Sequence, residues 1–182
     1  MIFDLIDYLL GSLKMMVNKL FYLKRLQIQL IGKYSRSVQI RLFSKSSMKV
    51  GKNFLMRSGV KIRANYYGKL IIGNRVGFNN DCMISCMSEI IIGDNVIFGQ
   101  GVKLYDHDHD YKKTGIIRDS GYISEPILIK DNVWIGSNCV ILKGAVIGSN
   151  TVIGANTVVY GNIPDNSVVY SNRNLIFKKR GV

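Results

Sequence analysis

An unbroken six-residue repeat over residues 129–158 constrains the fold more than any other feature of the chain. Each unit begins with isoleucine, at Ile129, Ile135, Ile141, Ile147 and Ile153. This period fits neither the ~3.6 residues per turn of an α-helix nor the two-residue alternation of a plain strand. It is typical of a parallel β-helix, in which short strands turn corners onto successive faces.

Three columns of the repeat agree on one frame. The first position is large and apolar, and we expect it to form the core: Ile72, Phe78, Ile84, Ile92, Phe98, Leu104, Ile129, Ile135, Ile141, Ile147, Ile153 and Val159. The fourth position is asparagine or glycine, which adopt positive φ readily at tight corners: Asn95, Gly101, Asn132, Asn138, Gly144, Asn150 and Asn156. The fifth is small or β-branched and suits a narrow interior: Val96, Val102, Val133, Cys139, Ala145, Thr151 and Thr157. We therefore predict a mainly β fold, a parallel β-helix over residues 49–170.

Residues 1–48 do not follow the hexads and are interpreted as a basic amphipathic helical segment, with helix over residues 1 to about 31. Apolar residues recur there at helical spacing: Ile2, Leu5, Ile6, Leu9, Leu13, Met16, Val17, Leu20 and Leu23. Asp4, Asp7 and Lys14 interrupt the apolar stretch, so we expect no bilayer-spanning segment and no signal peptide. Two roles stay open. The helix packs on the coil or at a subunit interface, or it lies on a membrane surface.

The formal net charge of +13 suits phosphate-bearing ligands or anionic lipid. No nucleic-acid-binding motif is present, so we expect no nucleic-acid partner. The three cysteines lack zinc spacing and are interpreted as structural thiols, which fits a reducing cytoplasm. We expect a cytoplasmic protein, with peripheral contact at the inner membrane face through the helix as an alternative.

An inserted loop at about 105–126 breaks the frame and contains both histidines of the chain, His107 and His109. Functional residues concentrate on loops that a rigid scaffold positions. A histidine flanked by aspartates can act as a general base. A cation site and a solvated polar loop are the alternatives. A three-histidine zinc site within one chain is excluded by the count of two.

The hexads, the looped-out insertion and the segment Asp131-Asn-Val-Trp-Ile-Gly136 resemble the hexapeptide-repeat O-acetyltransferases, including maltose, galactoside, colanic-acid and capsule acetyltransferases. The resemblance covers residues 49–180. It implies a left-handed β-helix, a homotrimer with active sites between subunits, acetyl-CoA as co-substrate and no required metal.

The resemblance also implies site residues. The family's catalytic histidine falls on His109, and a functional asparagine falls nearest Asn79, with Asn80 as a fallback. The implied acetyl-CoA contacts lie along the coil and in the basic tail, residues 171–182: Trp134, Gly136, Ser137, Lys143, Ala155, Thr157, Lys178, Lys179 and Arg180. Tyr160-Gly161 replaces a Thr-Lys pair common in the family, so the phosphate-binding lysine is not at its usual place.

The resemblance implies acetyl transfer from acetyl-CoA to a hydroxyl of a sugar or glycan, such as a surface polysaccharide unit. His109 would accept the hydroxyl proton, and a backbone N–H near Gly136 would stabilise the oxyanion. N-acetylation of an amino sugar or nucleotide sugar is the first alternative. A metal-dependent lyase and a non-catalytic β-helix scaffold are the others.

Overall fold

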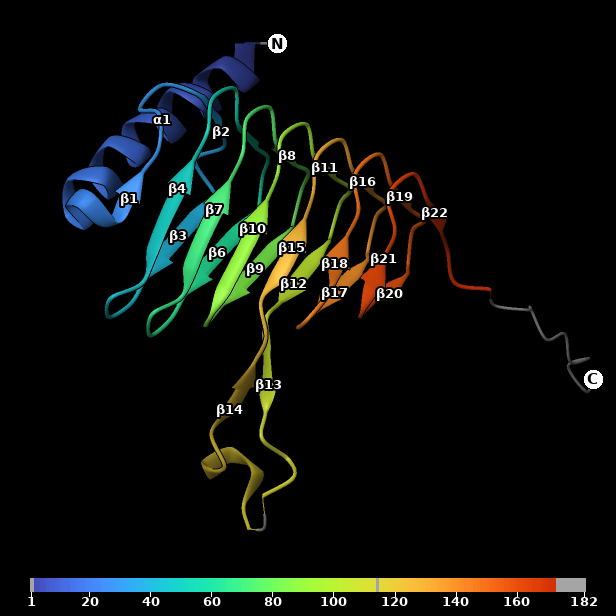
Figure 1. Cartoon of the computed structure of the whole chain (residues 1–182). Helices are drawn as coiled ribbons and strands as arrows, with labels where there is room; N and C mark the ends of the chain where they lie inside the picture. The colour runs from blue at the N-terminus through green and yellow to red at the C-terminus, as the bar shows by residue number, and fades with distance from the viewer. Residues whose placement is uncertain (1, 114, 173–182) are drawn as a thin grey trace, which may run out of the picture.

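The computed structural model describes residues 2–113 and 115–172 and shows a β-solenoid with one helix at its N-terminal end (Figure 1). Helix α1 (Ile2–Tyr22) is followed by the 3₁₀ turn η1 (Leu23–Arg25) and then by the first coil. The predicted parallel β-helix with an N-terminal helical segment is confirmed. Among the described residues, no helix is long and apolar enough to cross a bilayer.

Three parallel sheets form the walls of the solenoid, and consecutive strands of the chain fall on successive sheets. Sheet A contains β1 (Leu26–Gln27), β4 (Ser47–Val50), β7 (Lys69–Ile72), β10 (Glu89–Ile92), β15 (Ile127–Ile129), β18 (Val146–Ile147) and β21 (Asn162–Ile163). Sheet B contains β2 (Lys33–Tyr34), β5 (Leu55–Met56), β8 (Gly77–Phe78), β11 (Ile97–Phe98), β16 (Trp134–Ile135), β19 (Val152–Ile153) and β22 (Val168–Val169). Sheet C contains β3 (Gln39–Leu42), β6 (Lys61–Ala64), β9 (Met83–Cys86), β12 (Lys103–Tyr105), β17 (Val140–Leu142) and β20 (Val158–Val159).

The core and corner columns lie where the hexads place them. Every residue of the first column and every residue of the fifth column named above is buried. Every asparagine and glycine of the fourth column has φ between 56° and 73°. The stack also contains a pair of parallel rings, Phe78 and Phe98, whose centroids are 4.3 Å apart. The six-residue period therefore predicts which side chains face the axis and which turn the chain.

The solenoid begins earlier than the expected boundary at residue 49. Strand β1 pairs with β4 and places Leu26 beside Met48, so residues 26–48 already form a coil. The next coil places Met48 beside Leu70, so the coils at this end are longer than three hexads. Longer corners thus hide the repeat in this part of the sequence. Helix α1 also ends at Tyr22, before the expected end near residue 31.

A hydrogen-bonded asparagine ladder runs down the corner between sheets A and B. Asn132 Nδ2 donates to Asn150 Oδ1 at 2.8 Å, and Asn150 Nδ2 donates to Asn166 Oδ1 at 3.1 Å. Asn150 has φ of 56°, in the left-handed region of the backbone. Residues with β-branched side chains are the most strained in this conformation. Asn150 therefore serves both the backbone turn and the contact between coils.

We predict that Asn150→Val lowers the free energy of unfolding by about 2 kcal/mol, because valine strains the left-handed backbone and removes both ladder bonds. The melting temperature should fall by roughly 4–8 °C for a domain of this size. Asn150→Gly is the matched control, because glycine keeps the backbone conformation and removes only the ladder. Equal losses in the two variants, measured by thermal circular dichroism, would show that backbone strain contributes nothing.

Candidate functional site

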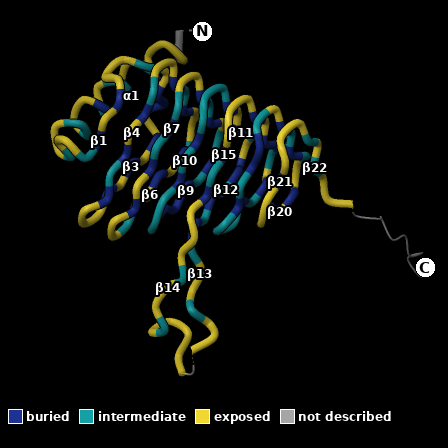
Figure 2. Tube along the Cα trace, in the orientation of Figure 1, coloured by how far each residue is buried: buried dark blue, intermediate teal, exposed yellow. Residues whose placement is uncertain are grey.

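The insertion that carries both histidines is a β-hairpin that projects from the solenoid wall (Figure 1). Strand β13 (His107–His109) pairs antiparallel with β14 (Tyr122–Ser124), and the connecting segment contains the 3₁₀ turn η2 (Ile117–Asp119). The hairpin leaves the corner between β12 and β15, where sheet C passes to sheet A. Most of the segment beyond its two strands is exposed (Figure 2).

Asp106 anchors the base of the hairpin. Its side chain is fully buried, and its carboxylate accepts hydrogen bonds from the backbone N–H of Met87 and of Ser88, each at 2.8 Å at the shortest. The same carboxylate lies 2.9 Å from Nδ1 of His107. A buried carboxylate is stable only with such partners. Asp106 therefore fixes the hairpin to the loop between β9 and β10.

The two histidines share one face of β13 because successive side chains of a strand alternate. The ring of Tyr122, on the neighbouring strand, contacts both. Its centroid is 5.6 Å from that of His107 and 4.7 Å from that of His109. His107 is mostly buried, with 13% of its side chain exposed, and is held by Asp106. His109 is exposed, and no polar partner contacts its ring among the described residues. His107 is thus oriented by the protein, and His109 is accessible to a substrate.

Lys143 lies beneath the hairpin. Its Nζ is 3.1 Å from Oε1 of Glu125 and 3.7 Å from Oδ2 of Asp108. The hydrogen bond to Glu125, with the charges of both carboxylates, raises the pKa of the Lys143 ammonium. In this chain Lys143 therefore joins the coil to the hairpin, and its charge is already balanced by carboxylates.

The corner between sheets B and C holds most of the other predicted residues. Asn79, Ser137 and Ala155 lie at this corner in different coils, and Asn79 and Ala155 are exposed. Gly136 is buried against the next coil, since a Cβ there would lie 2.6 Å from the backbone nitrogen of Ala155. Trp134 lies next to the corner, on the outer face of sheet B, with 55% of its surface exposed. The corner thus offers backbone groups beside an exposed apolar ring.

One residue of the predicted cofactor set needs correction, and three others lie outside the described residues. Thr157 belongs to the inner column and is 4% exposed, so its side chain faces the core and is unavailable to a cofactor on the outer surface. Its position in the fifth place of the hexad explains this burial. Lys178, Lys179 and Arg180 lie outside the described residues.

A cavity of about 440 Å³ adjoins Asn79 on the outer side of sheet B. Gly77 contributes to its floor, because the side-chain position between Leu55 and Ile97 on neighbouring strands is empty there. Arg57 and Arg75 also line the cavity. Guanidinium groups at this place could bind a phosphate or carboxylate group.

The predicted residues thus form two groups within one chain. Asn79 and the coil residues lie where sheet B passes to sheet C, and His109 lies beyond the opposite edge of sheet C. The hairpin also points away from the solenoid (Figure 1). One chain therefore does not bring His109 and Asn79 together.

The three cysteine thiols lie in the core and are not placed to react. Cys82, Cys86 and Cys139 are buried and unpaired with one another. Burial raises the pKa of the Cys82 thiol to about 11 and also raises the pKa of Cys86 and Cys139. Protonated, buried thiols are poor nucleophiles. Within residues 2–113 and 115–172, no cluster of three or more His, Cys, Asp or Glu side chains is placed to hold a metal ion.

Sequence reasoning missed the roles of Asp106 and Tyr122. The alternation of Asp and His residues puts His107 and His109 on one face now that the segment is seen to form a strand. It carried no signal that Tyr122, on the far side of the loop, would be the cross-strand partner of His109. The burial of Asp106 depends on backbone groups of another coil, which no local pattern predicts.

Comparison with known proteins supports the interpretation of the repeat. Residues 126–161 match the family model described as bacterial transferase hexapeptide (six repeats). No curated protein sequence matches the chain. The resemblance to hexapeptide-repeat acetyltransferases is confirmed by this match together with the solved structures that share the fold.

Among solved structures, the hexapeptide-repeat acetyltransferase VCA0836 of Vibrio cholerae O1 biovar eltor, in complex with acetyl coenzyme A, is 28% identical with a TM-score of 0.50. The match covers 72% of this chain and 66% of VCA0836, so the chain spans just under two thirds of that relative. A variant of AntD, an N-acyltransferase from Bacillus cereus in complex with dTDP and coenzyme A, is 16% identical, with 75% of each chain covered and a TM-score of 0.64. This likeness concerns the fold alone.

We predict that Asp106→Asn loosens the base of the hairpin, because an amide presents N–H groups to backbone N–H donors. Losing a charge-assisted hydrogen bond costs about 1.5–3 kcal/mol, so the amides of Met87 and Ser88 should exchange roughly 10–100 times faster. Hydrogen exchange measures this directly. Asp108→Asn is the control, since it alters only a partly exposed ion pair and should leave both amides protected. Unchanged exchange in Asp106→Asn would contradict the anchoring role.

Proposed function

We propose that this hexapeptide-repeat protein is an acyl-CoA-dependent acyltransferase that transfers an acetyl group from acetyl-CoA to a sugar or glycan hydroxyl. The observation that carries the proposal is the exposed, unpaired His109 on a hairpin whose base is fixed by a buried carboxylate. The named activity of VCA0836 and its bound acetyl coenzyme A support the choice of co-substrate. The basic composition of the chain suits a co-substrate that carries phosphates.

In this mechanism His109 accepts the proton of the attacking hydroxyl. The hydroxyl oxygen bonds to the thioester carbonyl carbon, and a tetrahedral oxyanion forms. A backbone N–H near Gly136 and Ser137 stabilises that oxyanion. The C–S bond then breaks, and His109 returns the proton to the coenzyme A thiolate. His107 is a positioning residue, since Asp106 and Tyr122 fix it at the root of the strand that carries His109.

The coenzyme would lie along the corner between sheets B and C. Trp134 offers an apolar face to the pantetheine arm, while Ser137 and Ala155 border the corner. Asn79 and the cavity beside it would receive the acceptor. Lys143 is reassigned from cofactor contact to support of the hairpin, because Glu125 and Asp108 already neutralise it.

A complete site requires a second copy of the chain, which fits the homotrimer implied by the family resemblance. The hairpin would reach the corner of a neighbouring subunit and bring His109 to its Asn79. Sheet B offers an apolar surface for such contact, with Ile97, Trp134 and Val168 exposed on its outer face. Proximity of the two substrates in this closed site would supply much of the rate.

We predict that His109→Ala lowers kcat by roughly 100- to 10,000-fold, the usual range for loss of a general base. His107→Ala should cost less in kcat, and coenzyme A affinity should be nearly unchanged in the His109 variant. Thiol release from acetyl-CoA measures turnover, and calorimetry measures affinity. Equal losses, or a greater loss at His107, would assign the base to the other histidine. Hydroxyl and amino sugars tested side by side decide between O- and N-acetylation.

We also predict subunit complementation. His109→Ala and Asn79→Ala should each be poorly active, while mixed oligomers should recover roughly a quarter of wild-type turnover, the share of interfaces that pair two intact side chains under random mixing. Co-expression supplies the mixture, and light scattering should give the mass of a trimer. No recovery, or an active monomer, would contradict a site shared between subunits.

A further inference from the structure

Helix α1 is inverted relative to an ordinary surface helix. The face toward the solenoid comprises Tyr8, Gly11, Ser12, Met15, Asn18, Lys19 and Tyr22, all buried or half-buried, and apart from Met15, which joins the core, it is formed by glycine and by residues with polar groups. The exposed face comprises Leu5, Ile6, Leu9, Leu10, Leu13, Met16, Val17, Leu20 and Phe21. A surface helix normally buries its apolar stripe against the core. Here that stripe points away from the protein.

The inward polar face is explained by the edge that it covers. The first coil ends each sheet and leaves backbone groups without strand partners. Side chains of α1 satisfy several of them: Ser12 Oγ donates to the Gly32 carbonyl at 3.2 Å, and Lys19 Nζ donates to the Ile28 carbonyl at 3.2 Å. Tyr22 Oη donates to the Ile40 carbonyl at 3.3 Å. The helix is thus a polar cap on a sheet edge.

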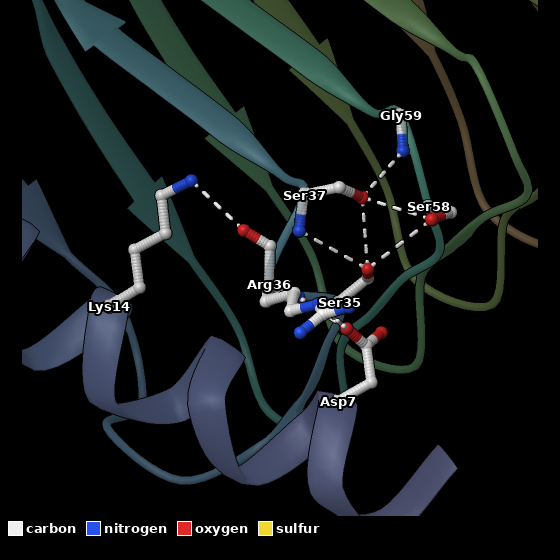
Figure 3. Close-up of polar contacts among 7 residues, drawn as sticks. All are labelled: Asp7, Lys14, Ser35, Arg36, Ser37, Ser58 and Gly59. Carbon is white, nitrogen blue, oxygen red and sulfur yellow. Dashed lines mark hydrogen bonds and ion pairs between the residues drawn. The ribbon is translucent and has the colours of Figure 1, made fainter. Parts of the chain in front are cut away.

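Contacts to Arg36 fix the rotation of the helix about its axis (Figure 3). Lys14 Nζ donates to the Arg36 carbonyl at 3.0 Å, and the Arg36 backbone N–H donates to Asp7 Oδ1 at 3.1 Å. Gly11 also approaches closely, since a Cβ there would collide with the Tyr34 carbonyl oxygen. Rotating the apolar stripe inward would break these contacts, so the outward direction is built into the fold.

The outward stripe continues into an open apolar groove of about 1330 Å³ between the end of α1 and the first coils. Leu20 lines this groove and is 76% exposed. Phe21 and Ile31, which follow the lining residues Leu20 and Leu30 in the sequence, are 78% and 85% exposed. Contiguous apolar surface of this extent marks an interaction site on a folded protein.

The positive charge around the groove indicates the kind of partner that this surface would bind. Four lysines line the groove, Lys19, Lys24, Lys49 and Lys52, and no acidic residue does. Lys24, Lys49 and Lys52 are exposed and make no ion pair within the described residues. Over residues 1–52, ten of the twelve charged side chains are basic. Two copies meeting face to face here would bring like charges together, which disfavours self-association through this surface.

We propose that this end of the solenoid docks on an anionic lipid bilayer surface, with the apolar face of α1 in the interface and the lysines on the headgroups. An interfacial helix binds through apolar burial together with attraction to anionic lipid. The surface includes none of the residues assigned to acyl transfer, so docking and chemistry can be tested separately.

The test measures co-sedimentation of the full chain with phosphatidylcholine vesicles that contain or lack phosphatidylglycerol. Leu20→Glu combined with Phe21→Glu should weaken binding to anionic vesicles by more than about 100-fold, the cost of losing two buried apolar side chains. Tyr160→Glu combined with Tyr170→Glu, which adds the same two negative charges at exposed residues of the far coils, is the matched control and should bind as the wild type does. Both sites are exposed, so the variants should fold, and thermal melting verifies this.

A second arm tests the lysines. Replacing Lys24, Lys49 and Lys52 with alanine should reduce affinity for anionic vesicles by roughly 100-fold, at about one kcal/mol per lysine, and high salt should reduce wild-type affinity similarly. A fluorescent dye attached to Leu13→Cys should shift its emission to the blue on vesicles, because the dye would enter an apolar environment. The label is selective, because the three native cysteines are buried.

Three outcomes would overturn the proposal: no binding to anionic vesicles, equal binding by all variants, or larger oligomers that only the Leu20→Glu/Phe21→Glu variant dissociates. The last would assign the face to a second copy of the chain. Vesicle binding without thiol release would leave docking intact and reject the acyltransferase, and the reverse result would reject docking alone.

Discussion

The structure depends on corners that turn the chain sharply without a side-chain clash. At each regular corner one residue adopts positive φ, and asparagine or glycine fills that position throughout the later hexads. This single requirement accompanies the six-residue period. Each hexad supplies a short strand and a corner to one wall, so each wall has one large inward side chain and one small inward side chain per coil. It also aligns equivalent corners of successive coils, which produces the straight edge beside Trp134, Ser137 and Ala155. Where one corner is expanded, between Tyr105 and Ile127, the chain builds the hairpin without disturbing the pairing of β10 with β15.

The amount of structure that the sequence predicts varies along the chain for the same reason. The later coils are three hexads long, as between Leu128 and Val146, and their columns can be assigned without error. The first coils are longer, as between Met48 and Leu70, and residues such as Ser44 and Tyr66 adopt positive φ in place of asparagine. Those corners carry no compositional signal, so the pattern gives no sign that residues 26–48 form a coil. The hairpin could be predicted as an insertion, because the hexad frame breaks after Leu104 and resumes at Ile129. Its internal pairing could not, because Tyr122 and the backbone of Met87 are brought to it only by the fold.

For helix α1, the amphipathic pattern predicts that a helix forms but does not predict which face of the helix is buried. The spacing of Leu5, Leu9, Leu13 and their neighbours correctly indicates a helix, and the usual inference is that such a stripe covers the core. A solenoid end differs from a globular core, because its exposed surface includes unpaired backbone carbonyls as well as apolar side chains. Hydrogen-bond donors on α1 satisfy those carbonyls, and an unsatisfied carbonyl there would cost about 1–3 kcal/mol. The polar face is therefore needed inside, and the apolar face remains outside.

In the proposed enzyme, the rigid stacking of the coils makes acyl transfer depend on contact between subunits. A rigid stack of parallel coils cannot bend its two edges toward each other, so Asn79 and the root of the hairpin stay on opposite sides of sheet C. Flexibility of the hairpin does not remove this separation, because Asp106 and the ion pair of Lys143 with Glu125 fix both of its strands to the solenoid. In the proposed oligomer, the corner of an identical subunit would be the surface that this outward-pointing hairpin contacts. Catalysis by His109 would then depend on assembly without any conformational change, since each subunit supplies its hairpin to a neighbour in the geometry in which it folds.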